Sequence, residues 1–525
     1  MKINSVLIVG GGSSGWMTAA ALTKMFGDDI KISLIEGKNS SPVGVGESTI
    51  ILFNRFLELV GLKDTDWMRH CNATYKTSIR FTNFRVGKGE VFEYPFGGFP
   101  TEETMLLWSV LNAKYNLSPE SFCEFQSDPY FLAKHNRLTK NTDERLRFNF
   151  NMDTAYHFDA GVFGQFLKKK ICDPGGTTHY VDDVVAFEKD DRGYLTSVVG
   201  DSGQKYSADL FIDCTGFKSL LLEKEMESEF ISYKPWLSND RAVAAHLPYT
   251  NKKTQLSNVT NCTALSSGWS WNIPLWKRMG TGYVYSSDFI DDDSAEKEFK
   301  KHIGTEDVDI RKIRIRHGVR KKGWVKNVVG VGLSYGFVEP LESTGLVSTH
   351  AVIDKLVELL ERRELNPTRF DIDCYNHSCQ KILNGYKDFV ALHYRISSRN
   401  DTPYWRYQTE EKDWTDLKDD RLVSVSEIVN NDTVYEGFEE YLYRSHGDNH
   451  RWDSERHGIS YILAGMGHKP YGKYLFNQIE QMNAPEWMNN IDNVYQEWRE
   501  HVRMTEGYVK TLPTSFEFLK KYIYS

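Results

Sequence analysis

The stretch SVLIVGGGSSGWMTAAAL, residues 5–22, decides the fold of this chain. Its first five residues form a short apolar, β-branched run that predicts a strand buried on both faces, and the alanine-rich run from Trp16 predicts a helix. Gly10, Gly12 and Gly15 between them have the G-x-G-x-x-G spacing. These glycines allow a tight turn, approach of the backbone to a pyrophosphate and close packing of helix on strand, so the stretch predicts a dinucleotide site.

A second predicted strand, residues 31–35, supports this interpretation. It ends at Glu36, 26 residues after Gly10, near the position where an acidic side chain binds a ribose hydroxyl. The helix that follows the glycine turn would direct its N-terminus at the phosphates. Later in the chain, an apolar run at residues 209–213 leads into CTGF at 214–217, as expected of a FAD-binding architecture that returns to its cofactor.

Length and composition limit the possible classes of protein. The chain has 525 residues, which is too long for one simple layer, so we expect two modules. The net charge of −8 gives no reason to expect nucleic acid, and the basic run at 311–322 alternates like a strand with a solvated face. Seven scattered cysteines, an odd number without C-x-x-C spacing, indicate a reduced protein without a zinc site. With no apolar run long enough for a membrane span and no room for a signal peptide, we expect a cytoplasmic protein.

Two further segments have compositions suited to a planar ligand. PVGVGES, residues 42–48, contains glycines that allow backbone to lie against a flat ring. VFEYPFGGF, residues 91–99, combines aromatic side chains with a proline and a glycine pair, which predicts a loop that presents ring faces. Residues 73–84 have the composition of a strand and contain Lys76.

Three features together carry a resemblance to a known family. They are the fingerprint at 10–15, the pattern W-x-W-x-I-P at residues 269–274, and FVEPLESTG at 337–345. On these motifs the chain resembles the flavin-dependent halogenases, in particular the tryptophan or indole branch, over essentially its whole length. The resemblance implies an α/β fold: a FAD-binding box module like that of glutathione reductase and single-component monooxygenases, with a substrate-side sheet, over residues 1–347. A largely helical module, 348–525, would pack against it and close the substrate pocket.

The resemblance also implies the chemistry. Reduced FAD, O2 and halide would yield hypohalous acid, which reaches a lysine that matches Lys76. That lysine either donates a hydrogen bond to the acid or forms a haloamine, and a lowered pKa would favour the second route. Glu342 matches the glutamate that stabilises the cationic ring and accepts its proton. Halide would bind at the amides of Thr344 and Gly345. Taken alone, the strand around Lys76 predicts an ordinary surface lysine, and the alternative for Glu342 is a carboxylate in the first turn of the next helix.

The remaining site residues follow from the same resemblance. Trp269 and Trp271 would keep the substrate away from the flavin, although such a pattern also occurs as a core aromatic pair. Tyr94, Phe96 and Trp452 stand near the positions whose rings hold the indole. The implied FAD contacts are Gly10, Gly12, Ser13, Ser14, Gly15, Glu36, Val45, Gly46, Glu47, Ser48, Leu333 and Leu346.

One stretch departs from the family pattern and bears on the substrate. Residues 439–458, EEYLYRSHGDNHRWDSERHG, have Arg451 where an aromatic residue is expected and lack the recognisable tyrosine pair that holds the amino acid. We therefore expect a simple indole or another electron-rich aromatic to suit the site better than free L-tryptophan. The halide and the position of halogenation stay open.

Two other functions share the FAD fingerprint. A FAD-dependent aromatic hydroxylase would normally have its own access for a pyridine nucleotide and would not need Lys76, Glu342 or the paired tryptophans. A redox sensor without turnover would have no reason to keep Lys76 and Glu342. Because the chain has no second G-x-G-x-x-G unit, we expect a separate flavin reductase to supply FADH2, and we expect a homodimer that binds no metal, nucleic acid or membrane.

Overall fold

The computed structural model describes residues 2–38, 44, 46–85, 89–98, 100–140, 144–412, 414, 453–468 and 490–525. The chain divides into two compact units, each made of three segments. The first unit contains 1–74, 156–237 and 314–387, and the second contains 75–155, 238–313 and 388–525. The predicted boundary at 347/348 lies inside helix α10 (Thr344–Arg362). The whole of this helix belongs to the first unit, whose last segment ends at residue 387. That residues 348–525 close the substrate pocket stays a prediction.

The first unit is built on a six-stranded sheet in which β1 is central and joins parallel neighbours on both sides. β20 at one edge pairs antiparallel with β21, and the other neighbours in the sheet are parallel. In sheet order the strands are β20 (Trp324–Val325), β21 (Val328–Gly330), β12 (Leu210–Asp213), β1 (Ser5–Val9), β2 (Lys31–Glu36) and β8 (Thr178–Val181). The apolar side chains of β1 are buried, as expected for a strand in a parallel sheet. The strands predicted at 5–9, 31–35 and 209–213 are confirmed.

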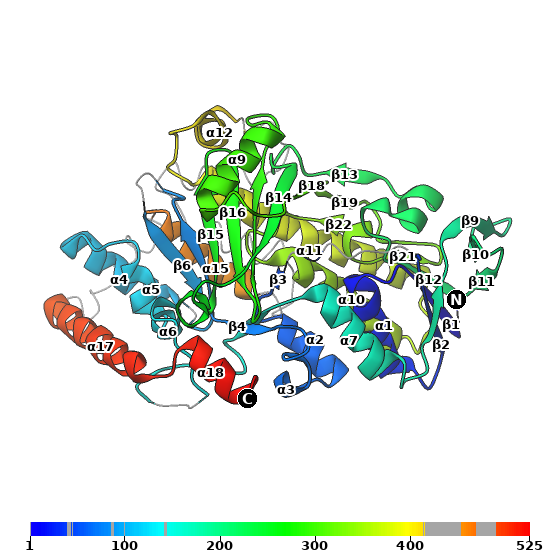
Figure 1. Cartoon of the computed structure of the whole chain (residues 1–525), viewed down its shortest axis with the longest axis horizontal. Coiled ribbons are helices and arrows are strands. Elements are labelled where there is room, and N and C mark those ends of the chain that lie inside the picture. Colours follow the sequence, from blue (N-terminus) through cyan, green and yellow to red (C-terminus); the bar gives the residue numbers. More distant parts are fainter. Residues whose placement is uncertain are drawn as a thin grey trace. The chain divides into compact units, whose positions relative to one another are not determined.

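Three helices pack together beside this sheet. α1 (Ser13–Phe26) contacts β1 and β2, and it also contacts α7 (Ala160–Leu167) and α10. Figure 1 shows these three helices beside one another, next to β1 and β2. α10 also packs on α2 (Phe53–Val60), which brings the helix after the FVEPLESTG segment against the helix after PVGVGES.

Smaller elements complete the first unit. They are α3 (Asp64–Trp67), the antiparallel pairing of β3 (Glu47–Ser48) with β7 (Ala155–Phe158), a sheet of β9 (Val184–Lys189), β10 (Leu195–Gly200) and β11 (Lys205–Ser207), and a sheet of β13 (Phe230–Ser232), β19 (Gly318–Arg320) and β22 (Gly336–Phe337). A π-helical turn, η1 (Lys168–Cys172), continues α7 directly. Such turns are rare and often lie at functional sites.

The second unit is built on a seven-stranded sheet that is mainly antiparallel, with one parallel pair between β15 and β5. In sheet order the strands are β18 (Arg311–Arg314), β14 (Arg241–Leu247), β17 (Met279–Tyr285), β16 (Gly268–Pro274), β15 (Val259–Leu265), β5 (Ser78–Thr82) and β6 (Val91–Pro95). α9 (Asp292–Ile303) covers part of one face, where Phe299 and Ala295 pack on Val243, Tyr283 and Tyr285. Asp291 caps this helix by accepting a hydrogen bond from the Ser294 amide at 2.9 Å.

The prediction of a loop at 91–99 is wrong for its first half. Residues 91–95 form β6, which pairs antiparallel with β5 and is the last strand in the order of the sheet. The alternation of Phe92 and Tyr94 with Glu93 has the period of a strand. Pro95 is tolerated because it stands at the end of an edge strand, where its missing N–H interrupts little of the ladder.

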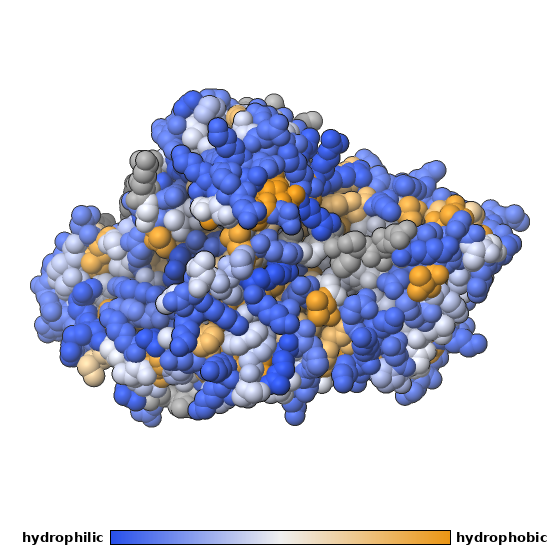
Figure 2. Space-filling view, in the orientation of Figure 1, coloured by the Kyte–Doolittle hydropathy of each residue, from blue (hydrophilic) through white to orange (hydrophobic). Residues whose placement is uncertain are grey.

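Helices dominate the C-terminal third of the described chain. Within 348–525 these are the rest of α10, α11 (Arg369–Arg395), α12 (Pro403–Arg406), α15 (Asp453–Gly465), α17 (Ile491–Thr511) and α18 (Ser515–Tyr522). The second unit also holds α4 (Glu102–Tyr115), α5 (Ser121–Gln126) and α6 (Pro129–Lys134). None of the helices in the described part of the chain combines the length and apolar composition that crossing a membrane would require. Figure 2 shows a face on which hydrophilic residues predominate and hydrophobic residues are scattered, which is ordinary for a protein surface.

Candidate active site

The glycine turn after β1 accepts no larger residue at two positions. Gly10 has φ +115°, and a Cβ added there would lie 2.3 Å from the carbonyl oxygen of Cys214. A Cβ at Gly15 would lie 1.9 Å from the carbonyl oxygen of Gly10, so α1 packs directly on the turn. The close packing predicted from the glycine spacing is therefore present. It also places the segment after β12 against the fingerprint, as the sequence predicted.

The start of α1 leaves room for an anion. Gly12 is the N-cap residue in extended conformation, and no side chain caps the helix. A Cβ at Gly12 would meet nothing within 4 Å, so the turn is open on that side. Because the first amides of a helix have no partners within it and lie at the positive end of its dipole, Ser13 and Ser14 begin a helix suited to phosphate. This geometry fits the pyrophosphate of a dinucleotide.

Glu36 lies beside the same turn. It ends β2, the neighbour of β1, and a Cβ placed on Gly11 would lie 1.9 Å from Glu36 Oε2. The carboxylate therefore rests against the backbone of the fingerprint at the carboxyl ends of the parallel strands. This is the edge where such sheets bind nucleotides, and an acid there fits a ribose hydroxyl.

Of two further FAD positions of the prediction, one lies in a turn that also reaches this region. Leu333 lies in the 3-10 turn η4 (Gly332–Ser334), where a Cβ on Gly332 would lie 2.8 Å from Ser14 Cβ and 3.6 Å from Thr349 Oγ1 of α10. Leu346, in the first turns of α10, is almost fully buried. Gly46 has φ +95° and leads into β3, whereas Val45 lies outside the described residues.

The segment 337–345 meets PVGVGES directly. Ser343 Oγ donates a hydrogen bond to Ser48 Oγ at 3.0 Å, across 295 residues of sequence. Ser343 itself is left-handed, with φ +60°, and its amide donates to the carbonyl of Pro340 at 2.9 Å. The helix that begins at Thr344 has no side-chain cap. A left-handed residue followed by helical ones forms a concavity of amides that suits an anion, so the geometry agrees with a halide at Thr344 and Gly345.

Glu342 stands outside the helix that follows it. Since Ser343 is the N-cap of α10 and the first turn of α10 contains no acidic residue, Glu342 is not a first-turn carboxylate. Its side chain is 2% exposed. A carboxylate that is held in place and shielded from water can exchange a proton with a bound substrate rather than with solvent.

Lys76 is a buried lysine and not a surface one. It ends β4 (Thr74–Lys76) with 0% exposure, and its Nζ lies 5.0 Å from the centroid of the Phe96 ring. The backbone brings the two together, because the Phe96 amide donates to the Thr77 carbonyl at 2.8 Å. An ammonium over an aromatic face is attracted by the ring, so Phe96 orients the Lys76 side chain.

Tyr94 is held by residues that the sequence analysis did not single out. Its ring stacks on Tyr461 of α15 at 5.7 Å between centroids, and Tyr461 donates a hydrogen bond to the Gly98 carbonyl at 2.8 Å. One face of Tyr94 is therefore covered by protein. Tyr461 carries no motif signal in the sequence, because helical periodicity alone does not distinguish a residue that supports a site from any other buried residue. Trp452, with residues 439–451 of the departing stretch, lies outside the described residues.

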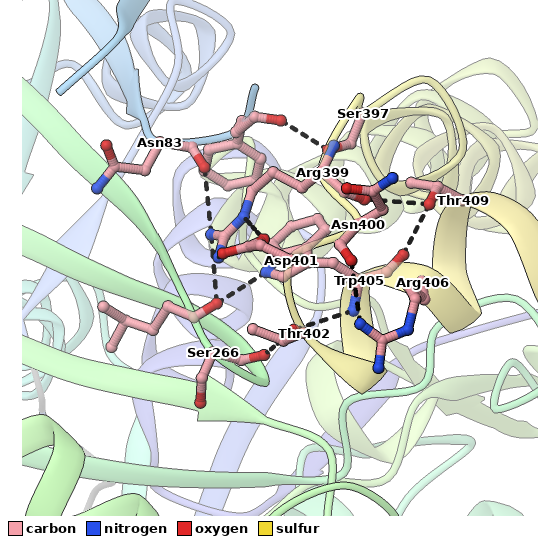
Figure 3. A network of polar contacts seen from close by, with 12 residues as sticks. Asn83, Ser266, Ser397, Arg399, Asn400, Asp401, Thr402, Trp405, Arg406 and Thr409 are labelled. Atoms are coloured by element: carbon pink, nitrogen blue, oxygen red, sulfur yellow. Dashed lines mark hydrogen bonds and ion pairs between the residues drawn. The ribbon is translucent and has the colours of Figure 1, made fainter. Parts of the chain in front are cut away.

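The paired tryptophans lie on one strand, β16. Trp269 and Trp271 are buried, and their ring centroids are 6.2 Å apart. The turn that precedes β16 is held by the segment 397–409 (Figure 3). Trp405 Nε1 donates to the Leu265 carbonyl at 2.8 Å, and Thr402 Oγ1 donates to the Ser266 carbonyl at 2.7 Å. The tryptophan strand therefore starts from a fixed turn.

Burial sets the protonation of three groups near the fingerprint and α10. It raises the pKa of Asp213, which ends β12 and accepts hydrogen bonds from the amides of Leu221 and Leu222 at 2.8 Å. Burial also raises the pKa of the Cys214 thiol to about 12, so this neighbour of Gly10 stays uncharged. On α10, burial lowers the pKa of His350 to about 3, which keeps its imidazole neutral.

The first unit has the features of a dinucleotide-binding protein. The central strand of its parallel sheet leads through a glycine turn into an uncapped helix, and an acidic residue ends the next strand. The profile of the family described as tryptophan halogenase matches residues 5–446. The chain belongs to this family and is a flavin-dependent halogenase, an enzyme of the oxidoreductase class that uses FAD and halide.

Relatives of known name cover most of the chain. It is 37% identical to the 7-chloro-L-tryptophan 6-halogenase KtzR of Kutzneria sp. (strain 744), over 76% of this chain and 81% of that protein. The apo structure of VirX1 covers 100% of both chains at 44% identity, with a TM-score of 0.90. The tryptophan C-6 flavin-dependent halogenase (chlorinase) from taromycin biosynthesis covers 98% of this chain and 100% of its own at 31% identity, with a TM-score of 0.82.

Proposed function

We propose that this halogenase substitutes a halogen for a ring hydrogen of an electron-rich aromatic, an indole derivative, with Lys76 activating the oxidant and Glu342 assisting substitution. The observation that carries the proposal is the burial of the Lys76 ammonium against the ring of Phe96, in a chain that has the family's other motifs. Lysine is among the residues least often taken fully out of water.

Lys76 has two ways to act on hypohalous acid. As an ammonium it donates a hydrogen bond to the oxygen, which makes the halogen more electrophilic. As an amine its nitrogen attacks the halogen, so that a nitrogen–halogen bond forms, the oxygen–halogen bond breaks, and the departing hydroxide takes a proton from the nitrogen and leaves as water. Both routes require the nitrogen at this position, so the test of the residue does not depend on the choice between them.

Glu342 and the start of α10 would act on opposite charges. The buried carboxylate stabilises the cationic ring produced by electrophilic attack and then accepts the proton lost from the ring carbon. The amides of Thr344 and Gly345, at the uncapped start of a 19-residue helix, would hold the halide anion. Ser343 and Ser48 keep this turn in place through their hydrogen bond.

The glycine turn, Glu36 and η4 would bind FAD in its reduced form. Reduced FAD, when bound, would supply the electrons that activate O2, and the activated oxygen would oxidise halide to hypohalous acid. The protein's own part is to hold the pyrophosphate on the start of α1 and a ribose hydroxyl on Glu36. A separate flavin reductase would deliver FADH2, since no second dinucleotide fingerprint is present in the sequence. We place the enzyme in the cytoplasm as a homodimer.

The proposed substrate is an indole without a free amino acid group. Two of the related proteins named above, KtzR and the halogenase from taromycin biosynthesis, are named for halogenation of tryptophan or its chloro derivative. Here the stretch 439–458 departs from the pattern that holds the amino acid. Burying an ammonium or a carboxylate without a partner costs on the order of 1–3 kcal/mol, so free tryptophan needs dedicated polar groups. Ring packing by Phe96 and Tyr94 would serve any simple indole.

The test compares Lys76→Met with wild type, in the presence of FAD, a flavin reductase, NADH and each halide in turn. Methionine keeps the length of the side chain and removes its nitrogen. We expect no halogenated indole by mass spectrometry, with unchanged FAD binding and unchanged halogenation of a small dione that traps hypohalous acid in solution. Lys521→Met, at an exposed position on α18, is the matched control. Halogenated indole from Lys76→Met at the wild-type rate would refute the role of Lys76.

A further inference from the structure

A chain of three polar side chains lies beside the fingerprint helix in the first unit. Lys168 Nζ donates a hydrogen bond to His179 Nδ1 at 2.9 Å, and His179 Nε2 lies 2.9 Å from Glu36 Oε1. The three residues come from η1, β8 and β2, so the contact joins distant parts of the sequence. The side chains of His179 and Glu36 are 17% and 16% exposed, which limits competition from water.

The hydrogen bond from Lys168 fixes the state of the histidine ring. An ammonium group can only donate, so Nδ1 must accept and cannot carry a proton. The ring proton is therefore on Nε2, the nitrogen that faces Glu36. The contact between Nε2 and Oε1 is a close polar approach of 2.9 Å that does not have the geometry of a hydrogen bond. A proton beside one oxygen still orients the carboxylate.

The two oxygens of Glu36 consequently have different surroundings. Oε1 faces His179, whereas Oε2 rests against Gly11 of the glycine turn, where an added Cβ would lie 1.9 Å away. A glutamate side chain has several rotatable bonds, and binding a ligand with it requires that these be fixed. Engaging one oxygen from behind leaves the other presented to the turn.

Trp16 anchors the chain on the fingerprint helix itself. Its ring centroid is 5.2 Å from that of His179 in an edge-on arrangement, and Lys168 Nζ lies 5.3 Å from the Trp16 ring. Trp16 is fully buried and directly follows Gly15. Lys169 and Lys170 of the same π-helical turn are exposed, so the turn directs only Lys168 inward.

We infer that His179, held by Lys168, is a positioning residue that orients Glu36 toward the ribose hydroxyl in the adenosine half of FAD. The inference rests on the proposed binding of FAD by Glu36 and adds two residues to that site. It gives a reason for the contact of Lys168 and His179 with Glu36, whose backbone is already fixed by β2. The predicted effect is confined to the adenosine side of the cofactor.

The experiment measures dissociation constants for FAD, ADP and FMN by fluorescence titration of the full chain. His179→Phe keeps a ring against Trp16 and removes both nitrogens, and Lys168→Met removes the donor. We expect each variant to weaken FAD and ADP by about threefold to tenfold and to leave FMN, which lacks the adenosine ribose, unchanged. Lys169→Met is the matched control and should bind all three as wild type does.

Two further variants separate positioning from general support of the fold. His179→Gln keeps an N–H donor and should recover most of the affinity for ADP. In the double variant of His179→Phe with Lys168→Met, the second change should add nothing, because Lys168 acts through the histidine. Equal losses for FMN and ADP, or full additivity in the double variant, would overturn the inference.

The outcomes also distinguish this inference from the proposed function. A wild-type protein that binds neither FAD nor ADP would remove both. A wild-type protein that binds FAD, together with a His179→Phe variant that binds ADP within a factor of two of wild type, would leave the cofactor assignment standing and refute the positioning role.

Discussion

His350 makes the stability of the first unit depend on pH in a way that one substitution tests. Its ring stacks against those of Phe53 and Phe56, at 4.8 and 5.0 Å between centroids, and among the described residues neither ring nitrogen has a hydrogen-bond partner. This environment lowers the pKa of His350 from 6.5 to about 3 because a charged ring would be buried without water. The folded protein therefore keeps the ring neutral, whereas the unfolded chain protonates it below pH 6.5.

The size of the effect follows from the two pKa values. Between pH 6.5 and pH 3 the unfolded state binds one more proton than the folded state, so the stabilising contribution is complete above pH 6.5 and falls as the pH decreases. Each pH unit is worth about 1.4 kcal/mol, so at pH 5.0 the loss from this one group is about 2 kcal/mol. Because α10 carries both His350 and the proposed halide amides, halide-dependent turnover should decline over the same range.

The assay compares urea unfolding at pH 7.5 and pH 5.0 for wild type and His350→Phe, followed by tryptophan fluorescence. Other titrating groups contribute equally to both proteins, so the difference between the two pH-dependent losses isolates His350. We expect wild type to lose about 2 kcal/mol more than the variant. His377→Phe, at an exposed position of α11, should lose as much as wild type. An equal loss in wild type and His350→Phe would refute the reasoning.

Three shorter predictions address the remaining parts of the site. Glu342→Gln should form hypohalous acid at the wild-type rate and substitute indole more slowly, and an unchanged rate in single-turnover mass spectrometry would remove Glu342 from the mechanism. Arg399→Lys should lower the free energy of unfolding by about 1–3 kcal/mol in urea titrations, because lysine cannot pair with Asp401 through two parallel bonds and also reach the Leu265 carbonyl; the exposed Arg503→Lys is its control, and an equal change in both would contradict the prediction. A specificity constant for L-tryptophan more than about tenfold above that for indole, about 1.4 kcal/mol, would show that polar anchors for the amino acid exist.

The parts of the fold predicted correctly from the sequence are those whose cause is local. The strand and helix around the glycine turn follow from a β-branched run, an alanine-rich run and a spacing that only a few structures require. Gly10 and Gly15 make this concrete, since backbone atoms occupy the space that any side chain there would need. The edge strand β6 was missed because Pro95 and the following glycines suggested a loop, and only the order of strands shows that a proline is harmless there.

Contacts between distant segments lay beyond the sequence. Ser48 and Ser343 are joined by a hydrogen bond, yet nothing in either motif refers to the other. The interleaved segments of the two units are a consequence of pairing such as that of β15 with β5, which no local pattern encodes. Motif resemblance supplied Lys76 and Glu342 as residues with roles, but their burial is a property of the folded sheets and helices.

Lys76 and Lys168 show which properties of a lysine follow from a sequence motif and which follow only from the fold. On a strand or at a helix end, a lysine is by composition a solvated residue. For Lys76 the neighbouring motifs overrode that expectation, and the structure places its ammonium against Phe96. For Lys168 no motif did so, and it stands in a run of three lysines of which two are exposed. What turns Lys168 inward is a π-helical turn and the acceptor nitrogen of His179. Lys168 is therefore identified by the acceptor that it contacts in the fold, and not by its place in a sequence pattern.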